Sequence, residues 1–313
     1  MRFPDGRRSP ALHHLSLVLA GLVGTFLLVG FVLRPSRTAD VLDARTIEAI
    51  SPFWQSEPWW WFVRLGNPAS YLQFCLALVF VAALRRRWRL ALLIPPTMVA
   101  SELMAQNLKQ LLAAPRDVPL AAARIADASW PSGHSTAAMT VALLAILVAP
   151  RRLRPLVAVV GGLGACGVGL GLIAGRYHYP TDVFGGYLCA AIWVTLAAMV
   201  LVAWQRWRPA PTPPDRRPLR PVHVAGPLLL LGLGLLIAAS RAARTDGGLL
   251  GTVDQHTAAV VVVGAIVALA LTLVAAATTL TAAGEDEARE APLSGPRPAA
   301  RAVPRRRWPP ARG

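Results

Sequence analysis

The sequence predicts an all-α protein, a polytopic bundle of membrane helices. The first observation is composition: the 313 residues are 55% hydrophobic, with a mean hydropathy of +0.48. Soluble domains of this size are less apolar. The second observation is that apolar residues gather in eight blocks, most of them long enough to cross a bilayer as a helix.

The net charge of +16, from 32 Lys and Arg against 16 Asp and Glu, has two explanations. It could serve a nucleic-acid partner, or it could belong to cytoplasmic loops that orient a multi-span protein. Arginine clusters such as those at 85–89 and 151–154 lie directly beside apolar blocks. Their position favours loops, and we expect no nucleic-acid partner.

The first apolar block, about residues 12–33, follows a short basic segment at 1–11 that we expect to be cytoplasmic. A signal peptide and a first span both begin this way. Because the block exceeds the ~7–15 apolar residues of a signal peptide and no small-residue cleavage site follows, we expect a span. Residues 34–68 are polar, with prolines and a tryptophan cluster, and predict an interfacial segment on the outer face.

Five further blocks complete a membrane-embedded region at 12–204. Their spans are predicted at about 69–84, 90–114, 134–149, 156–175 and 180–204. Pro95 and Pro96 should kink the third span or delay its helix start. In the fifth span Gly167, Gly171 and Gly175 recur every four residues, which predicts close helix packing along one face.

The C-terminal part is predicted to add two spans within 222–283, at about 222–240 and 257–283. A Pro/Arg-rich linker at 205–221 precedes them, and the charged, proline-rich tail at 284–313 predicts disorder. With the N-terminus inside, the cytoplasmic segments carry more than twice as many Lys and Arg residues as the outer ones. This bias predicts that both termini are cytoplasmic.

Two cations lie at the predicted outer end of the third span, which Lys109 closes. Lys109 is the only lysine of the chain, and Arg116 comes seven residues later, about two helical turns. Snorkelling of a long side chain to the interface would explain either cation alone. Together they would form two charge clamps for an anion.

Pro131-Ser132-Gly133-His134 opens the fourth span. Ser132 can cap the helix, Gly133 permits close backbone approach, and the free N–H groups at the helix start form an anion site. His134 could then protonate a leaving oxygen as a general acid. Taken alone, the stretch is also ordinary turn chemistry.

His178-Tyr179-Pro180-Thr181-Asp182 opens the sixth span, with proline near the first turn. The spacing of four residues lets Asp182 reach one ring nitrogen of His178, fix its tautomer and leave the other nitrogen free to attack an electrophile. The alternative is an interfacial histidine beside an aspartate that complements the helix N-terminus. The topology collects all three stretches on one outer face, which favours a phosphate pocket.

These stretches resemble the three-part signature of the type 2 phosphatidic acid phosphatases (PAP2), membrane relatives of the vanadium haloperoxidases. The signature is Lys-x6-Arg-Pro, Pro-Ser-Gly-His and Ser-Arg-x5-His-x3-Asp. Lys109 and Arg116 match the first part in spacing, residues 131–134 match the second completely, and His178 with Asp182 match the end of the third. The resemblance covers roughly residues 70–205 and implies a six-span PAP2-like core, here followed by two extra C-terminal spans.

The sequence departs from this signature at two places. Asp117 replaces the proline after Arg116, and the Ser-Arg pair falls on Gly171-Leu172. The missing arginine matters more, because in the family it clamps the phosphate. Either Arg176 substitutes for it, or the site is weakened, or activity has been lost.

The resemblance implies a metal-independent phosphatase that hydrolyses a lipid phosphate or polyprenyl diphosphate at the outer membrane face. His178 would attack phosphorus and form a phosphohistidine, Asp182 would orient it, and His134 would protonate the leaving group. The substrate-binding groups would be Lys109, Arg116, Ser132, Gly133 and Arg176. No cofactor is expected, and the partners would be the bilayer and a phospholipid or polyprenyl substrate.

Two alternatives stay open. A catalytically weakened lipid-phosphate binding or transport protein on the same scaffold would bind substrate without turnover. A zinc hydrolase could use His134, His178 and Asp182 as ligands, although Lys109 and Arg116 would repel the ion.

Overall fold

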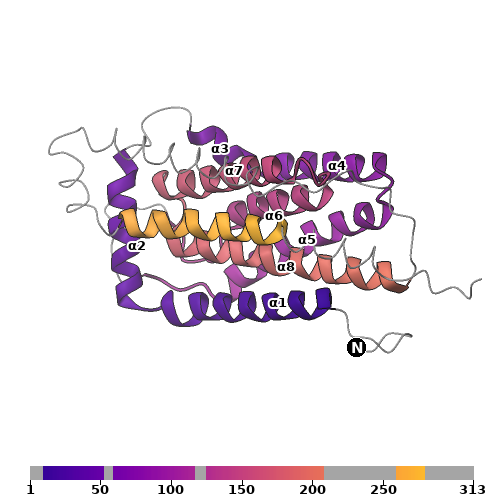
Figure 1. Ribbon diagram of the computed structural model, residues 1–313. Coiled ribbons are helices and arrows are strands. Elements are labelled where there is room, and N and C mark those ends of the chain that lie inside the picture. Colours follow the sequence, from indigo (N-terminus) through magenta and orange to yellow (C-terminus); the bar gives the residue numbers. More distant parts are fainter. Residues whose placement is uncertain (1–9, 53–58, 117–124, 208–258, 279–313) are drawn as a thin grey trace, which may run out of the picture.

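The computed structural model describes residues 10–52, 59–116, 125–207 and 259–278 (Figure 1). Every regular element within these ranges is helical, as the sequence predicted. The elements are α1 (Pro10–Leu28), the π-helix η1 (Val29–Leu33), α2 (Arg37–Ile50), α3 (Trp59–Leu65), α4 (Pro68–Leu84), α5 (Trp88–Leu111), α6 (Gly133–Val148), α7 (Arg154–Ala174), α8 (Pro180–Trp207) and a further helix at Ala259–Thr278.

Four helices in the described ranges are long and apolar enough to cross a membrane. They cover Ala11–Leu33, Arg154–Ala174, Pro180–Gln205 and Ala259–Thr278, and the helices α4 and α6 are apolar but shorter. These helices indicate a membrane protein. The predicted seventh span at 222–240, the linker from residue 208 onward and the tail lie outside the described residues, so the count of six spans plus two stays a prediction. Residues 205–207 of the predicted linker belong to α8.

The helix α6 lies inside the bundle and packs against α5, α7 and α8. Most of its side chains are buried, because nearly all of them are apolar or small. From α8, the buried hydroxyl of Tyr187 donates to the carbonyl of Ala165 on α7 at 2.6 Å. Close packing of α7 also depends on glycine: a Cβ at Gly167 would lie 2.5 Å from the ring of Phe62 on α3. The predicted glycine-lined face is therefore used for helix contact at this position.

The segment predicted as a polar connection, 34–68, folds in part into two helices, α2 and α3. In Figure 1, α2 stands across one end of the bundle, roughly perpendicular to the long helices, and it contacts both α7 and α8. Ser36 caps its N-terminus by accepting a hydrogen bond from the N–H of Ala39 at 3.2 Å. Because α2 covers the bundle end, it buries polar side chains as well as Ile47.

The helix α5 begins at Trp88 and continues through Pro95 and Pro96 to Leu111. The prolines therefore do not delay the helix start, and the alternative prediction, a kink, stays a prediction. α5 carries Lys109 in its last turn, which places this cation at the end of the helix as expected.

Candidate active site

The start of α8 holds His178 and Asp182 in contact. Asp182 lies in the first turn of α8, is fully buried, and its Oδ2 is 3.3 Å from Nδ1 of His178. The N–H of Tyr179 donates to the same oxygen at 3.0 Å, which fixes the carboxylate. His178 itself is 8% exposed. Since Nδ1 faces the carboxylate, Nε2 is the nitrogen available for a nucleophilic attack.

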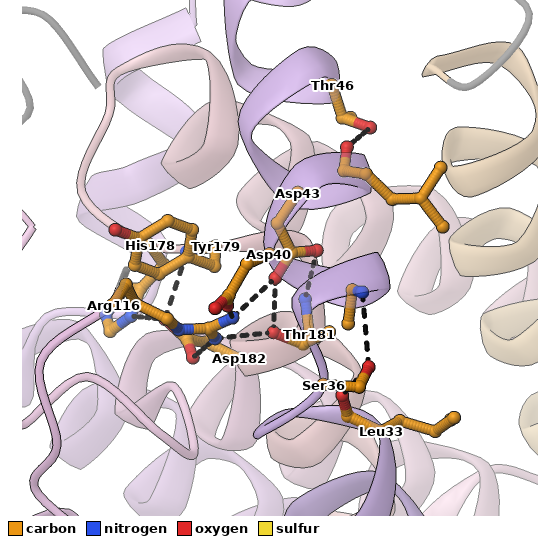
Figure 2. A network of polar contacts seen from close by, with 12 residues as sticks. Leu33, Ser36, Asp40, Asp43, Thr46, Arg116, His178, Tyr179, Thr181 and Asp182 are labelled. Carbon is orange, nitrogen blue, oxygen red and sulfur yellow. Dashed lines mark hydrogen bonds and ion pairs between the residues drawn. The ribbon is translucent and has the colours of Figure 1, made fainter. Parts of the chain in front are cut away.

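The guanidinium of Arg116 is paired with carboxylates from two helices (Figure 2). Its Nη1 donates to Oδ1 of Asp40 and, at 3.3 Å, to Oδ2 of Asp43, both on α2. Its Nη2 donates to Oγ1 of Thr181 at 2.8 Å and lies 3.7 Å from Oδ1 of Asp182. The predicted clamp is thus fixed beside the His178 loop by three acidic residues.

Asp40 and Asp43 are two site residues that sequence reasoning missed. Both are buried, and their spacing of three residues places them on one face of α2. Asp43 also accepts from the hydroxyl of Thr181 at 2.6 Å and from its N–H at 3.3 Å. That spacing was visible in the sequence, but nothing there indicated that the segment folds back over the site.

Burial and neighbouring charges shift the pKa values of this cluster. Burial raises the pKa of Asp43 to about 7, although the hydrogen bond from Thr181 and the charge of Arg116 act in the opposite direction. Burial alone would lower the pKa of Arg116. Its hydrogen bond to Asp40 and the charges of Asp182 and Asp43 outweigh burial, so the pKa of Arg116 is raised.

The loop before α6 is tied directly to the loop before α8. The N–H of Ser132 donates to the carbonyl oxygen of Asp182 at 3.0 Å. Ser132 Oγ in turn accepts from the N–H of Ser135 at 3.4 Å and caps α6, as the sequence predicted. A Cβ at Gly186 on α8 would lie 2.6 Å from the carbonyl oxygen of Ser132, so only glycine permits this approach.

His134 is positioned from the loop before α4. Its Nε2 is 3.0 Å from Oδ1 of Asn67, and a Cβ added to Gly66 would lie 2.9 Å from Cβ of His134. The charges of His178 and Lys109 both act on the His134 ring, so the two histidines share one electrostatic environment. Gly66 and Asn67 were not predicted, because their contact with His134 joins segments far apart in sequence.

Lys109 approaches the start of α6 from α5. Its Nζ lies 3.5 Å from the point that a Cβ of Gly133 would occupy, and Oε1 of Glu102 and Nε2 of Gln106 lie at 3.0 and 2.9 Å. The charges of Glu102 and Asp182 act on the lysine. Gly133 therefore permits side chains of α5 to approach closely, and Glu102 and Lys109 are its charged neighbours.

The structure describes Leu172, where the signature arginine is missing, and Arg176, its predicted substitute. Leu172 is 1% exposed, and its carbonyl accepts from the N–H groups of Tyr177 and His178 at 2.9 and 3.3 Å. Arg176 has a φ of 58°, and its Nε donates to Oγ of Ser51 after α2 at 3.0 Å. Asp117 lies outside the described residues.

The described residues contain no group of three His, Cys, Asp or Glu side chains arranged to hold a metal ion. Residues 97–208 match the family model described as the PAP2 superfamily. This match confirms the resemblance for the part of the chain that carries Lys109, Arg116 and both histidine loops. No curated protein and no solved structure gives a significant match to the chain. Asp40, Asp43 and Asn67 lie before the matched segment.

Proposed function

Since residues 97–208 carry the PAP2 superfamily match, we propose that the protein is a metal-independent phosphatase of a lipid phosphate or polyprenyl diphosphate. The family suggests phosphatase chemistry, and the apolar helices suggest a substrate presented by the bilayer. Phosphatidate, phosphatidylglycerophosphate and undecaprenyl diphosphate are the candidate substrates. The reaction would take place at the outer membrane face and pass through a phosphohistidine.

One observation carries the proposal: Nδ1 of His178 faces the buried Asp182 carboxylate at 3.3 Å. This contact favours the tautomer that leaves a lone pair on Nε2. In the proposed step, Nε2 forms a bond to phosphorus while the bond from phosphorus to the leaving oxygen breaks. Asp182 stabilises the positive charge that develops on the ring.

His134 is the proposed acid for the leaving oxygen. With the amide of Asn67 oriented as in the structure, Oδ1 accepts a hydrogen bond from Nε2–H and orients the ring. The proton on Nδ1 is then the one donated to the leaving group. In the second step a water molecule attacks the phosphohistidine, gives its proton to His134 and releases inorganic phosphate.

Lys109 and Arg116 are proposed to neutralise the equatorial oxygens of the transferring phosphoryl group. The N–H groups near Ser132 and Gly133, at the start of α6, would add donors without any further reorganisation. Arg176 remains a proposed contributor from the loop after α7.

A second function is favoured by a specific observation. Position 172 is a buried leucine, and Arg116 is already paired with three carboxylates. A site with this charge balance could bind a lipid phosphate and turn it over slowly or not at all. Such a protein would bind or transport the lipid on the same scaffold.

A phosphate-release panel separates the two functions. Purified wild-type protein and His178→Ala are assayed with each candidate lipid in the presence of a chelator, beside a lipid-binding assay. The phosphatase proposal predicts release by the wild type and none by the variant. Equal release by both proteins would refute it, and binding without release would establish the second function.

A further inference from the structure

Arg34 lies at the corner between η1 and α2, and it is not part of the predicted site. Its N–H donates to the carbonyl of Val29 at 2.8 Å, which ends η1. The same π-helix packs on the loop before α6: a Cβ at Gly30 would overlap the Trp130 ring. Trp130 directly precedes the Pro131–His134 stretch, and α2 begins three residues after Arg34. Arg34 therefore lies between α2 and the π-helix that packs on the loop before α6.

The guanidinium of Arg34 is buried without a hydrogen-bond partner at Nε. The residue is 8% exposed, and its Nε has no partner among the described residues. Nε of Arg116 is also buried without a hydrogen-bond partner, although both Nη atoms of Arg116 are paired. A buried donor that is left unpaired costs free energy, so two such donors point to a missing acceptor.

The two guanidinium groups are electrostatic neighbours. Burial lowers the pKa of Arg34, and the charge of Arg116 lowers it further, whereas Asp182 and Asp40 act in the opposite direction. Two like charges in a buried site repel each other. An anion bound near both groups would offset this repulsion and supply an acceptor for the unpaired Nε of Arg34.

We propose that Arg34 binds the substrate phosphate together with Arg116 and supplies the guanidinium that position 172 lacks. This inference rests on the proposed phosphatase function. Leu172 is a core residue, so a cation has to come from another element. Arg34, between η1 and α2, provides this cation, and α2 also carries Asp40 and Asp43. The ligand is a phosphoryl group with at least two oxygens free to accept, as in a monoester or a terminal diphosphate.

Arg176 is the rival cation. Its Nε donates to Ser51, whereas Nε of Arg34 has no partner among the residues that the structure describes. Alternatively, Arg34 is a counter-ion that only balances the acidic residues of α2. These explanations predict different effects of each substitution on phosphate affinity.

The test compares Arg34→Gln and Arg34→Lys with Arg176→Ala and with Arg37→Gln. Arg37 is exposed and lies three residues away, at the start of α2. Three quantities are measured: KM for the lipid substrate, Ki for inorganic phosphate, and the rise in Tm that inorganic phosphate produces. Loss of a charge-assisted hydrogen bond should raise KM and Ki roughly ten- to a hundredfold in Arg34→Gln. Arg34→Lys should be intermediate, and Arg37→Gln should match the wild type.

The outcomes separate this inference from the proposed function. If Arg34→Gln loses Tm but keeps the wild-type KM and Ki, Arg34 is only a counter-ion and the inference is wrong. It is also wrong if phosphate leaves the Tm of the wild type unchanged, or if only Arg176→Ala loses phosphate affinity. If wild type and His178→Ala show the same activity, the phosphatase proposal fails. An Arg34-dependent Tm rise with phosphate would still support the binding role.

Discussion

The N–H of Ser132 donates a hydrogen bond to the carbonyl oxygen of Asp182 at 3.0 Å. This bond joins the N-cap of α6 to the first turn of α8; His134 lies in the first turn of α6, and His178 lies in the loop just before α8. The separation of His134 and His178 is therefore set by packed helices. Arg116 then attaches α2 to the same place through Asp40 and Asp43.

Asp43→Asn should change how stability depends on pH. The folded protein holds the pKa of Asp43 at about 7, above its ordinary value of 3.8. Folded protein therefore binds a proton that unfolded protein has released, and a tenfold difference in proton affinity between the two states corresponds to ~1.4 kcal/mol. This stabilising contribution is complete below the unfolded pKa and is lost as the pH rises through the folded pKa.

We expect the Tm of the wild type to fall between about pH 5 and pH 8 more steeply than that of Asp43→Asn. The measurement is a thermal unfolding series in detergent. Asp127→Asn is the control, because Asp127 is exposed and should leave the slope unchanged. Parallel slopes for wild type and Asp43→Asn would contradict the raised pKa of Asp43.

Gly66→Ala should displace His134. The added Cβ would lie 2.9 Å from Cβ of His134 and 3.0 Å from its Cδ2, closer than carbon atoms can approach without movement. A shift of the acid by a fraction of an ångström should lower kcat ~10-fold or more, with a smaller effect on KM.

Gly164→Ala is the matched control for this variant, because a Cβ at Gly164 meets nothing within 4 Å. Steady-state kinetics of both alanine variants provide the comparison. Wild-type kcat in Gly66→Ala would show that the position of His134 does not limit the reaction.

Asn67→Ala should weaken the acid without loosening α4. Asn67 precedes α4, but its side chain makes no capping hydrogen bond, so its removal spares the helix. Loss of the acceptor at Nε2 should lower kcat most for substrates with a poor leaving group. The measurement compares a lipid monoester with a nitrophenyl phosphate in both proteins. An equal loss for the two substrates would argue for a structural role only.

Leu172→Arg should harm the protein although it recreates the arginine of the family signature. Leu172 is 1% exposed, and a guanidinium there would be buried among apolar side chains. We expect a lower Tm and no gain in activity, whereas Leu172→Met should stay close to wild type because its volume is conserved. Higher activity in Leu172→Arg would mean that the pocket reaches position 172 and that Arg34 is not its replacement.

The sequence predicted the long helices well because their apolar blocks are continuous and end at arginine clusters. Observed α6 and α8 begin at Gly133 and Pro180, next to the residues predicted to open them. It also predicted the contact of His178 with Asp182, since four residues on a helix start are a local relationship. The roles of these side chains stay predictions until they are measured.

The contacts that α2 and the loop before α4 make with the site could not be predicted in the same way. Arg116 pairs with Asp40 across 76 residues, and His134 contacts Asn67 across 67 residues. No periodicity encodes such pairs. The helix α2 is short and polar, so its sequence resembled a polar connection between spans. The burial of Asp40 and Asp43 follows only from the packing of α2 across the bundle end.

The most direct test of the central claim is to locate the phosphate on the protein during turnover. Wild-type protein is mixed with a lipid phosphate, quenched in alkali, which preserves phosphohistidine, and digested for mass spectrometry. The account predicts phosphate on His178 in the wild type and none in His178→Ala, which should also lose turnover. Phosphate on a different residue, or full turnover in His178→Ala, would contradict it.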